Sequence, residues 1–301
     1  MLGNKVINEL VSQALQKSPQ FIGMDNVVAK EILHHEILYF LHKEGFLQQL
    51  TFMGGTALRL CYGSNRLSED LDFAGGQTFS PDKFHGLAEA LKNHIYQVYR
   101  LNVAVYEPKL EAGDTSTWKL TIEKFANRPD LPSQKCHIDI CAYPSLDRVY
   151  KPVTDHYGIG SKIEGLPIAV ESLEEILADK LIAFAYRERR IKPRDVWDLA
   201  WLSQRAIKID LSLVVKKLEL RRKNQNEFIG LISRHAELIK SSAETKRDFY
   251  QEMSRFVSPE VSQRTLDQVE FWSYVASVIG GYVDDCRLML GKKNTSSKMT
   301  M

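Results

Sequence analysis

Cysteine is scarce in this sequence. Its 301 residues include four cysteines, and no two of them are spaced as C-x-x-C. They lie mostly in apolar stretches, at Cys61, Cys136, Cys141 and Cys286. This setting favours reduced thiols that pack in a core, and it argues against a disulfide framework, a redox motif or a zinc site. We therefore expect a cytoplasmic protein.

Long apolar runs are lacking too. The N-terminal stretch MLGNKVINELVSQALQ mixes polar residues into a helical rhythm and has no unbroken apolar core of the kind that signal peptides carry. The longest late apolar run, FWSYVASVIGGYV, is too short to cross a bilayer and is followed by Asp284 and Asp285. The sequence therefore predicts no association with a membrane.

The chain also has little net charge, +2 from 40 basic and 38 acidic residues. Such a total does not by itself indicate a nucleic-acid-binding protein, although it can hide a basic surface opposite an acidic cleft. Two basic clusters occur in the second half, YRERRIKPR and KKLELRRK. A charge run is usually a solvated helix face, but a polyanion such as RNA would need a surface of this kind.

The spacing of apolar residues, by contrast, changes clearly along the sequence. Helical spacing of apolar residues fills the first fifty residues, short β-type runs and glycine turns follow, and helical spacing returns after Pro167. We predict an α+β protein with a mixed sheet flanked by helices in a first lobe, a mostly helical second lobe and a disordered polar tail. The predicted boundaries are 1–165, 166–290 and 291–301.

The individual elements follow from the same patterns. Helices are predicted over 4–17, 25–47, 56–62 and about 80–99, and strands over 50–53, 71–74, 101–106, 118–124 and 136–141. In the second lobe, Ser172 and Glu175 form a capping-box pattern that opens a helix to about Arg190. Pro193 then begins the next helix.

One stretch, FMGGTALRLCYGSNRLSEDLDFAGG, places two aspartates one residue apart. Side chains of a strand alternate between its faces, so Asp70 and Asp72 share a face while Leu71 and Phe73 face the core. Adjacent like charges repel, and a divalent cation with oxygen ligands such as magnesium would compensate them. The alternative is an edge strand with a solvated polar face, where two aspartates would be ordinary.

Two further features favour a metal site. Gly54 and Gly55 lie between a strand and a helix, where backbone amides can approach phosphate oxygens and the helix N-terminus favours negative charge. Asp139, between Ile138 and Ile140, supplies a third carboxylate on a strand. Three carboxylates on neighbouring strands can hold two magnesium ions, one at the attacking oxygen and one at the leaving phosphates.

Together these features resemble the nucleotidyltransferase superfamily of DNA polymerase beta, whose active site has a glycine turn, a D-x-D strand and a later carboxylate strand. The stretch GGTALRLCYGSNRLSEDLDF is similar to the signature of the AbiEii/AbiGii toxin family, in which GGTAL is followed by R-x-S-x-D-L-D-F. KLIAFAYRERRIKPRDVWDL is similar to the second signature of that family. The residues at the signature positions are Arg66, Ser68, Asp70, Asp72, Lys180, Arg187, Arg194, Asp195 and Asp198.

The resemblance covers roughly residues 25–280. It implies a nucleotidyltransferase lobe followed by a helical lobe, acting on an NTP with Mg²⁺ or Mn²⁺. Family members, including the MenT type, are toxins of toxin–antitoxin or phage-defence systems; some transfer nucleotides to the acceptor end of tRNA, and AbiEii-type members are described as binding GTP. The implied partners are therefore an NTP, an RNA acceptor such as tRNA and a cognate antitoxin protein.

The motifs and the resemblance assign a role to each candidate residue. The predicted metal ligands are Asp70, Asp72 and Asp139. The predicted catalytic residues are Asp70, Asp72, Lys180 and Asp195. The predicted nucleotide-binding residues are Gly54, Gly55, Thr56, Arg66, Ser68, Lys180 and Arg187.

The second signature has two interpretations. Lys180 and Arg187 are seven residues apart, so on one helix they would share a face and could present an ammonium and a guanidinium to the triphosphate. Alternatively, Arg187, Arg194, Asp195 and Asp198 form an ion-pair network that locks two helices together.

Ser68 and His137 each have two interpretations as well. Ser68 either orients the loop before Asp70 or is a site of regulatory phosphorylation, where added negative charge would block nucleotide entry. His137 shares a face with Asp139 and either packs or touches the substrate.

The favoured function is transfer of NMP to RNA. Transfer to a protein, or GTP binding without turnover, is compatible with the same motifs, because metal ligands do not encode the acceptor.

Overall fold

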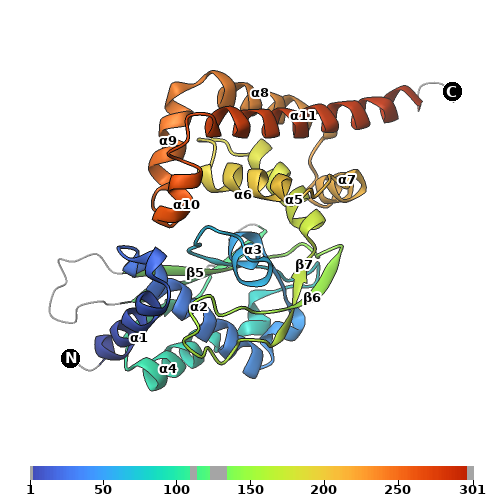
Figure 1. Cartoon of the computed structure of the whole chain (residues 1–301). Coiled ribbons are helices and arrows are strands. Elements are labelled where there is room, and N and C mark those ends of the chain that lie inside the picture. Colours follow the sequence, from blue (N-terminus) through green and yellow to red (C-terminus); the bar gives the residue numbers. More distant parts are fainter. Residues whose placement is uncertain (1–2, 109–113, 123–133, 297–301) are drawn as a thin grey trace. The chain divides into compact units, whose positions relative to one another are not determined.

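A computed structural model describes residues 3–108, 114–122 and 134–296 (Figure 1). The chain divides into two compact units, Met1–Glu171 and Ser172–Met301, which are described separately. The division lies six residues beyond the boundary predicted after residue 165. The reason is that β7 (Pro167–Glu171), expected to open the helical lobe, pairs with strands of the first unit instead.

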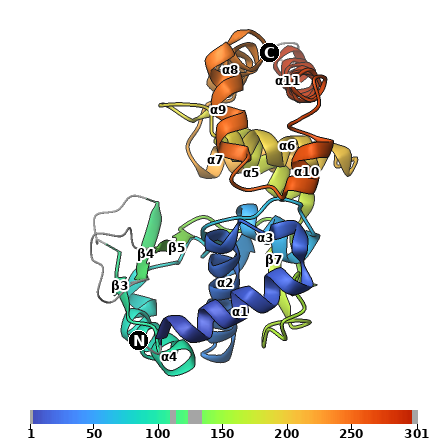
Figure 2. The same ribbon diagram turned by 60° about the vertical axis from the view of Figure 1, so that its left-hand side comes forward.

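Unit 1 begins with two helices, α1 (Gly3–Lys17) and α2 (Asp25–Lys43). Both were predicted, but α2 ends four residues early because Gly45 adopts a left-handed conformation, with φ +81°, before the short helix η2 (Phe46–Gln49). α2 buries residues around most of its circumference, as a helix inside a core does. It packs against α1 and α4 (Leu87–Tyr99), and the three helices lie together in both views (Figures 1 and 2).

The described residues of unit 1 form a mixed sheet of seven strands in the order β3-β4-β5-β2-β1-β7-β6. β2 lies near the middle, parallel to β5 on one side and antiparallel to β1 on the other. The strands not yet given are β1 (Thr51–Met53), β2 (Leu71–Ala74), β3 (Val103–Tyr106), β4 (Thr115–Ile122), β5 (Gln134–Cys141) and β6 (Arg148–Pro152).

The two faces of the sheet differ in polarity. Along β4, Trp118, Leu120 and Ile122 are buried, whereas Thr117 is half-buried and Lys119 is exposed. This alternation confirms the predicted strand, although β4 begins at Thr115 and the predicted end at 123–124 lies outside the described residues. One face of the sheet therefore joins the core, and the other carries polar side chains.

Two local predictions in unit 1 need correction. The helix expected from about residue 80 is a short η3 (Pro81–Phe84) followed by α4, because Gly86 adopts φ +80° between them. β6 was not predicted at all. Its sequence RVYKP has a proline and exposed positions, as an edge strand tolerates, so it gives little periodic signal.

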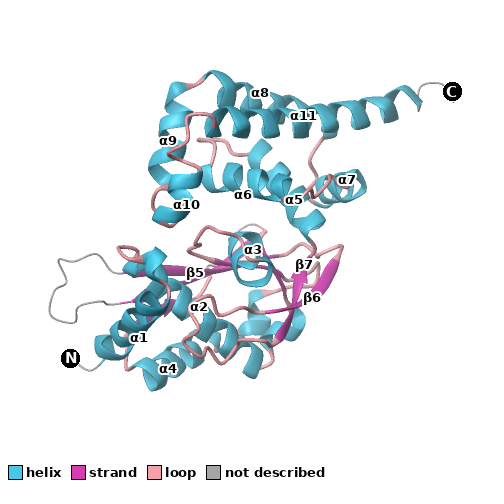
Figure 3. Cartoon of the chain, viewed as in Figure 1, coloured by secondary structure: helices cyan, strands magenta, loops and turns pink. Residues whose placement is uncertain are grey.

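Helices joined by loops make up unit 2 in its described residues (Figure 3). The capping pattern is confirmed, because the Ser172 hydroxyl accepts a 3.1 Å hydrogen bond from the amide of Glu175 at the start of α5. Across the described part of the chain, no helix is both long and apolar enough to span a bilayer. The helices are α5 (Leu173–Ala185), α6 (Pro193–Gln204), α7 (Leu211–Leu220), α8 (Gln225–Ser241), α9 (Ala243–Met253), α10 (Pro259–Arg264) and α11 (Phe271–Ser296).

The ends of two helices differ from the predictions. α5 ends at Ala185, five residues before the predicted end at Arg190, so Arg187 lies in the loop that follows. α11 continues to Ser296, so residues 291–296 are helical rather than disordered, and 297–301 lie outside the described residues.

Candidate functional site

The sheet register brings the D-x-D motif beside the third predicted carboxylate. β2 and β5 run parallel, and Asp72 pairs in register with Asp139. Because neighbouring strands are about 5 Å apart and paired residues share a face, the two carboxylates lie side by side. Both residues are half-buried at positions flanked by core residues. The fold thus joins two acids that are 67 positions apart in the sequence.

Asp70 lies one step further along the same face, just before β2 begins. Its Oδ1 accepts a 3.2 Å hydrogen bond from the backbone amide of His137 and lies 3.1 Å from the Nδ1 of the same residue. His137 is therefore in contact with the first aspartate of the motif, two residues before Asp139. The imidazole belongs to the site, which its position in the sequence had only suggested.

Thr117 is a site residue that sequence reasoning missed. Its hydroxyl donates a 2.6 Å hydrogen bond to Oδ1 of Asp139, which is its register partner on β5. The alternation of Thr117 and Lys119 with Trp118 marks a polar face, but the sequence alone does not say which strand lies beside it.

Gly54 allows a helix to begin directly against the carboxylates. It follows β1, opens α3 (Gly54–Tyr62) and has φ +76°. A Cβ at this position would lie 2.5 Å from Oδ2 of Asp72, which no folded structure tolerates without movement. Because the first amides of a helix have no intrahelical acceptor, this N-terminus offers donors for an anion next to Asp72.

Gly55 has a similar role toward Arg66. A Cβ on Gly55 would overlap Nη2 of Arg66, whose guanidinium is buried over the start of α3. Nη1 of Arg66 donates a 3.0 Å hydrogen bond to the carbonyl of Leu67. Arg66 and the buried Ser68 thus lie in the loop that leads to Asp70.

Thr56 connects this loop to the helix. Its buried hydroxyl donates a hydrogen bond to the backbone carbonyl of Asp70. The side chain therefore fixes the first aspartate, while its amide belongs to the N-terminal turn of α3.

The donor type of the three acids fits a hard cation such as Mg²⁺, which prefers carboxylate oxygens. Nevertheless, within residues 3–108, 114–122 and 134–296, no group of three or more His, Cys, Asp or Glu side chains is arranged as a ready metal site. Asp70 and Asp139 are turned toward His137 and Thr117. A cation held by all three acids requires these side chains to reorient.

The second predicted group forms a cluster within unit 2. Nζ of Lys180 lies 2.9 Å from Oδ1 of Asp195 and 2.8 Å from Oδ2 of Asp198. Nη2 of Arg187 lies 2.9 Å from Oδ2 of Asp195. Burial raises the pKa of Asp195, but the ion pairs with Lys180 and Arg187 outweigh it and hold the pKa well below its usual range. Asp195 and Asp198, three residues apart on α6, both face Lys180.

Arg194 has contacts with α9 and with Phe256. Its Nε lies 3.3 Å from Oε1 of Glu252 on α9, and its guanidinium stacks 4.8 Å from the ring centroid of Phe256. Glu252 also pairs with Arg190 at 3.0 Å. Arg190 and Arg194 of this basic cluster therefore connect the loop before α6, and α6 itself, to α9.

The second basic cluster is also partly internal. Nζ of Lys217 is buried between Glu175, at 2.8 Å, and Asp179, at 2.6 Å. Arg221 contacts Asp179 as well, at 2.7 Å. These cations neutralise acids of α5, so neither basic cluster is simply a solvated surface for RNA.

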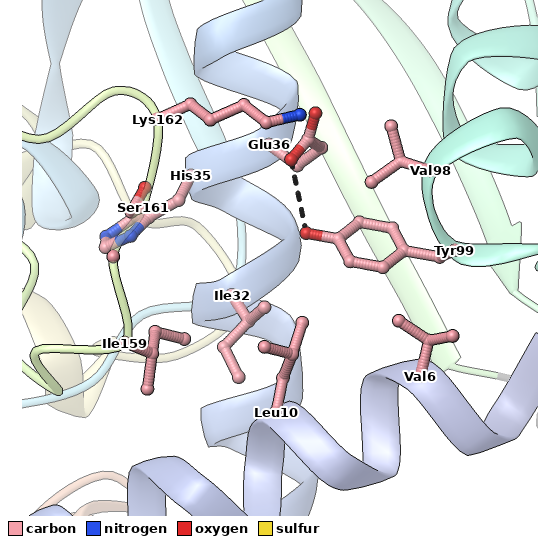
Figure 4. A pocket seen from close by; sticks show the side chains of 11 residues that line it. Val6, Leu10, Ile32, His35, Glu36, Val98, Tyr99, Ile159, Ser161 and Lys162 are labelled. Atoms are coloured by element: carbon pink, nitrogen blue, oxygen red, sulfur yellow. Dashed lines mark hydrogen bonds between the residues drawn. The ribbon is translucent and has the colours of Figure 1, made fainter.

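A separate pocket of about 210 Å³ lies between α1, α2, α4 and the loop at 159–162 (Figure 4). Glu36 accepts a 3.3 Å hydrogen bond from the hydroxyl of Tyr99 there, and His94 contacts its other oxygen at 2.7 Å. None of the predicted site residues lines this pocket. It is therefore distinct from the carboxylate face of the sheet.

Comparison with known families agrees with this geometry. Residues 36–274 match the family described as nucleotidyl transferase AbiEii toxin of type IV toxin–antitoxin systems. The chain belongs to this AbiEii family. It is accordingly a nucleotidyltransferase of a toxin family, as the two signatures predicted. No curated protein matches the chain.

One solved structure has a fold similar to most of this chain. MenT4, a nucleotidyltransferase toxin from Mycobacterium tuberculosis H37Rv, is similar with a TM-score of 0.54 at 16% identity, covering 91% of this chain and 89% of that one. A putative nucleotidyltransferase from H. pylori gives 0.46 at 17% identity, covering 87% and 97%. The α+β fold with its mixed sheet and flanking helices is confirmed by the MenT4 match.

Proposed function

We propose that this AbiEii-family enzyme transfers NMP from an NTP to a hydroxyl group of an RNA acceptor, such as tRNA, with Mg²⁺ or Mn²⁺ bound at Asp70, Asp72 and Asp139. The observation that carries the proposal is the register pairing of Asp72 with Asp139, with the N-terminus of α3 directly against Asp72. Acids and amide donors then meet at one place, as a nucleoside triphosphate with a bound cation requires.

A cation bound there would polarise the reacting phosphate and neutralise the charge that develops during transfer. The chain's own residues position the reactants. The amides of Gly54, Gly55 and Thr56 at the N-terminus of α3 donate to phosphate oxygens. The buried Arg66 and Ser68 hold the loop that presents Asp70.

The residues of the second signature lie in unit 2. Arg187 keeps 40% of its side chain exposed while Asp195 holds one edge of its guanidinium, which supports a role in binding phosphate. Lys180 is held between two buried carboxylates, which supports a role in fixing Asp195 and, through it, Arg187. We propose that these three residues act together as one phosphate-binding group.

Family membership supports a cognate antitoxin as the biological partner. The same proposal includes GTP among the NTP donors. It also includes a role of the toxin in phage defence.

The decisive experiment is to incubate the protein with each α-labelled NTP and total RNA, with and without added Mg²⁺ or Mn²⁺. We expect the wild type to label RNA. We expect Asp72→Asn to reduce the rate of RNA labelling by at least about 100-fold, because a neutral amide cannot replace a carboxylate that binds the metal. Asp25→Asn changes an exposed carboxylate on α2 and is the matched control.

Parallel reactions with cell protein in place of RNA test the second acceptor class. Label in protein but not in RNA would replace the acceptor in this proposal. Magnesium-dependent NTP binding in calorimetry with no release of pyrophosphate would instead indicate a nucleotide-binding module. Equal labelling by wild type and Asp72→Asn would remove the proposed site.

A further inference from the structure

A row of polar side chains extends from the carboxylates toward one edge of the sheet. Tyr106 on β3 pairs in register with Lys119 on β4, and Lys119 pairs with His137 on β5. His137 in turn contacts Asp70. Paired residues share a face, so an aromatic ring, an ammonium group, an imidazole and a carboxylate lie side by side across neighbouring strands.

The outer part of this row is open to solvent. Tyr106 is 59% exposed, and Lys119 is exposed beside it. Lys135 is a second exposed cation, two residues before His137 and therefore on the same face of β5. Cations interleaved with an aromatic ring are the combination that binds single-stranded nucleic acid, because phosphates meet the charges and bases stack on the ring.

The strand order places this row on the side of the site away from the predicted phosphate-binding amides. β1, which leads into α3 at Gly54, lies on one side of Asp72, and β5, β4 and β3 lie on the other side. In an in-line displacement the attacking oxygen enters opposite the leaving group. If pyrophosphate leaves toward α3, the acceptor approaches over β5, β4 and β3.

The spacing suits an oligonucleotide. Strands are about 4.8 Å apart, so three steps place Tyr106 roughly 14 Å from Asp70. Bases stacked about 3.4 Å apart cover that distance within a few nucleotides. The ring can therefore contact a base near the reacting end while the reacting hydroxyl lies at the carboxylates.

We propose that Tyr106 and Lys119 form an acceptor platform on the open face of β3 and β4, where Tyr106 stacks on a base near the reacting end of a single-stranded RNA and Lys119 pairs with its backbone phosphate. This inference rests on the proposed function and adds the surface that holds the acceptor. It also offers RNA a surface outside the basic clusters of unit 2, some of whose cations pair with acids of the same unit.

The test separates binding from catalysis. In an Asp72→Asn background, a short single-stranded RNA labelled at its 5′ end is titrated with Tyr106→Ala, Tyr106→Phe and Tyr150→Ala variants. Tyr150 is the matched control, because it is 66% exposed on β6 at the opposite edge of the same sheet. We expect Tyr106→Ala to weaken RNA binding about tenfold, Tyr106→Phe to bind nearly as wild type, and Tyr150→Ala to change nothing.

Two further measurements use the active enzyme. Tyr106→Ala should raise KM for RNA and leave KM for the NTP unchanged. Lys119→Gln should reduce the slope of log RNA affinity against log salt concentration by about one, because one phosphate contact is lost. Equal RNA affinity for Tyr106→Ala and Tyr150→Ala would overturn the platform. So would a raised KM for the NTP with unchanged RNA binding, which would make Tyr106 a donor-base contact.

The outcomes also separate this inference from the proposed function. If RNA binding depends on Tyr106 but labelling is unchanged by Asp72→Asn, the platform is supported and the proposed catalytic site is wrong. If Asp72→Asn abolishes labelling but Tyr106→Ala leaves RNA binding unchanged, the catalytic site is supported and the platform is wrong. Absence of RNA binding by every variant would overturn the platform.

Discussion

Gly54 shows how a single residue without a side chain shapes this site. It combines a left-handed backbone with contact to the carboxylate of Asp72, whereas Gly63, at the other end of α3, has φ +73° and no atom within 4 Å of a Cβ. The two glycines therefore share a backbone conformation that strains any residue with a Cβ, but they differ in what an added methyl group would meet.

We predict that Gly54→Ala and Gly63→Ala each lose about 1 kcal/mol of unfolding free energy from the left-handed conformation, with some additional loss at Gly54. Gly54→Ala should also reduce transfer by roughly 100-fold, because displacing a reacting group by about 1 Å has an effect of that size. Denaturant unfolding and the labelling assay measure both. Equal transfer activity of Gly54→Ala and Gly63→Ala would show that transfer does not depend on the position of Asp72 beside Gly54.

At the scale of elements, one ammonium group on α5 pairs with two buried acids of α6. Lys180 is 12% exposed between Asp195 and Asp198, which are almost fully buried. Removing it leaves two acids in a low-dielectric environment with one cation fewer, and a buried charge without its partner is strongly destabilising.

We predict that Lys180→Met lowers the unfolding free energy of unit 2 by roughly 3–5 kcal/mol. Lys216→Met, at an exposed position on α7, is the control and should change it little. Fluorescence of Trp197 and Trp201 on α6 reports the transition during denaturant unfolding. If Lys180→Met is as stable as Lys216→Met but no longer binds NTP, the lysine acts directly on the nucleotide instead.

Across the whole molecule, buried histidines should make unit 1 sensitive to acid. Burial lowers the pKa of His34 on α2 to about 4, and it also lowers the pKa values of His35 and His156. In the unfolded chain these residues titrate near pH 6.5, so below that value the unfolded state binds more protons than the folded state. Their stabilising effect is complete above about pH 6.5 and decreases as the pH falls toward 4.

We therefore predict that the unfolding free energy of unit 1 decreases between pH 7 and pH 4, with His34 contributing up to roughly 3 kcal/mol. Amide hydrogen exchange in α2 and β1 at several pH values measures the change. His34→Gln should flatten the pH dependence, whereas His42→Gln, at an exposed position on the same helix, should not. Slower opening of α2 and β1 to hydrogen exchange at pH 5 than at pH 7 would contradict the stabilising effect assigned to the neutral, buried histidines.

The sequence by itself determined the local features of this protein. Alternation along a strand fixed that Asp70 and Asp72 share a face, and the Gly54-Gly55 pair marked the start of α3. Ser172 marked the start of α5. These predictions succeeded because side-chain direction, turns and caps depend on residues within a few positions of each other. The family signatures are local in the same way.

Only the tertiary structure decided which of these segments are neighbours. The pairing of Asp72 with Asp139, the contact of His137 with Asp70 and the hydrogen bond from Thr117 all depend on strand order and register. The ion pairs of Arg194 and Lys217 likewise depend on how helices pack. Register and packing are set by burial of apolar faces across the whole unit, and no short stretch of sequence contains that information.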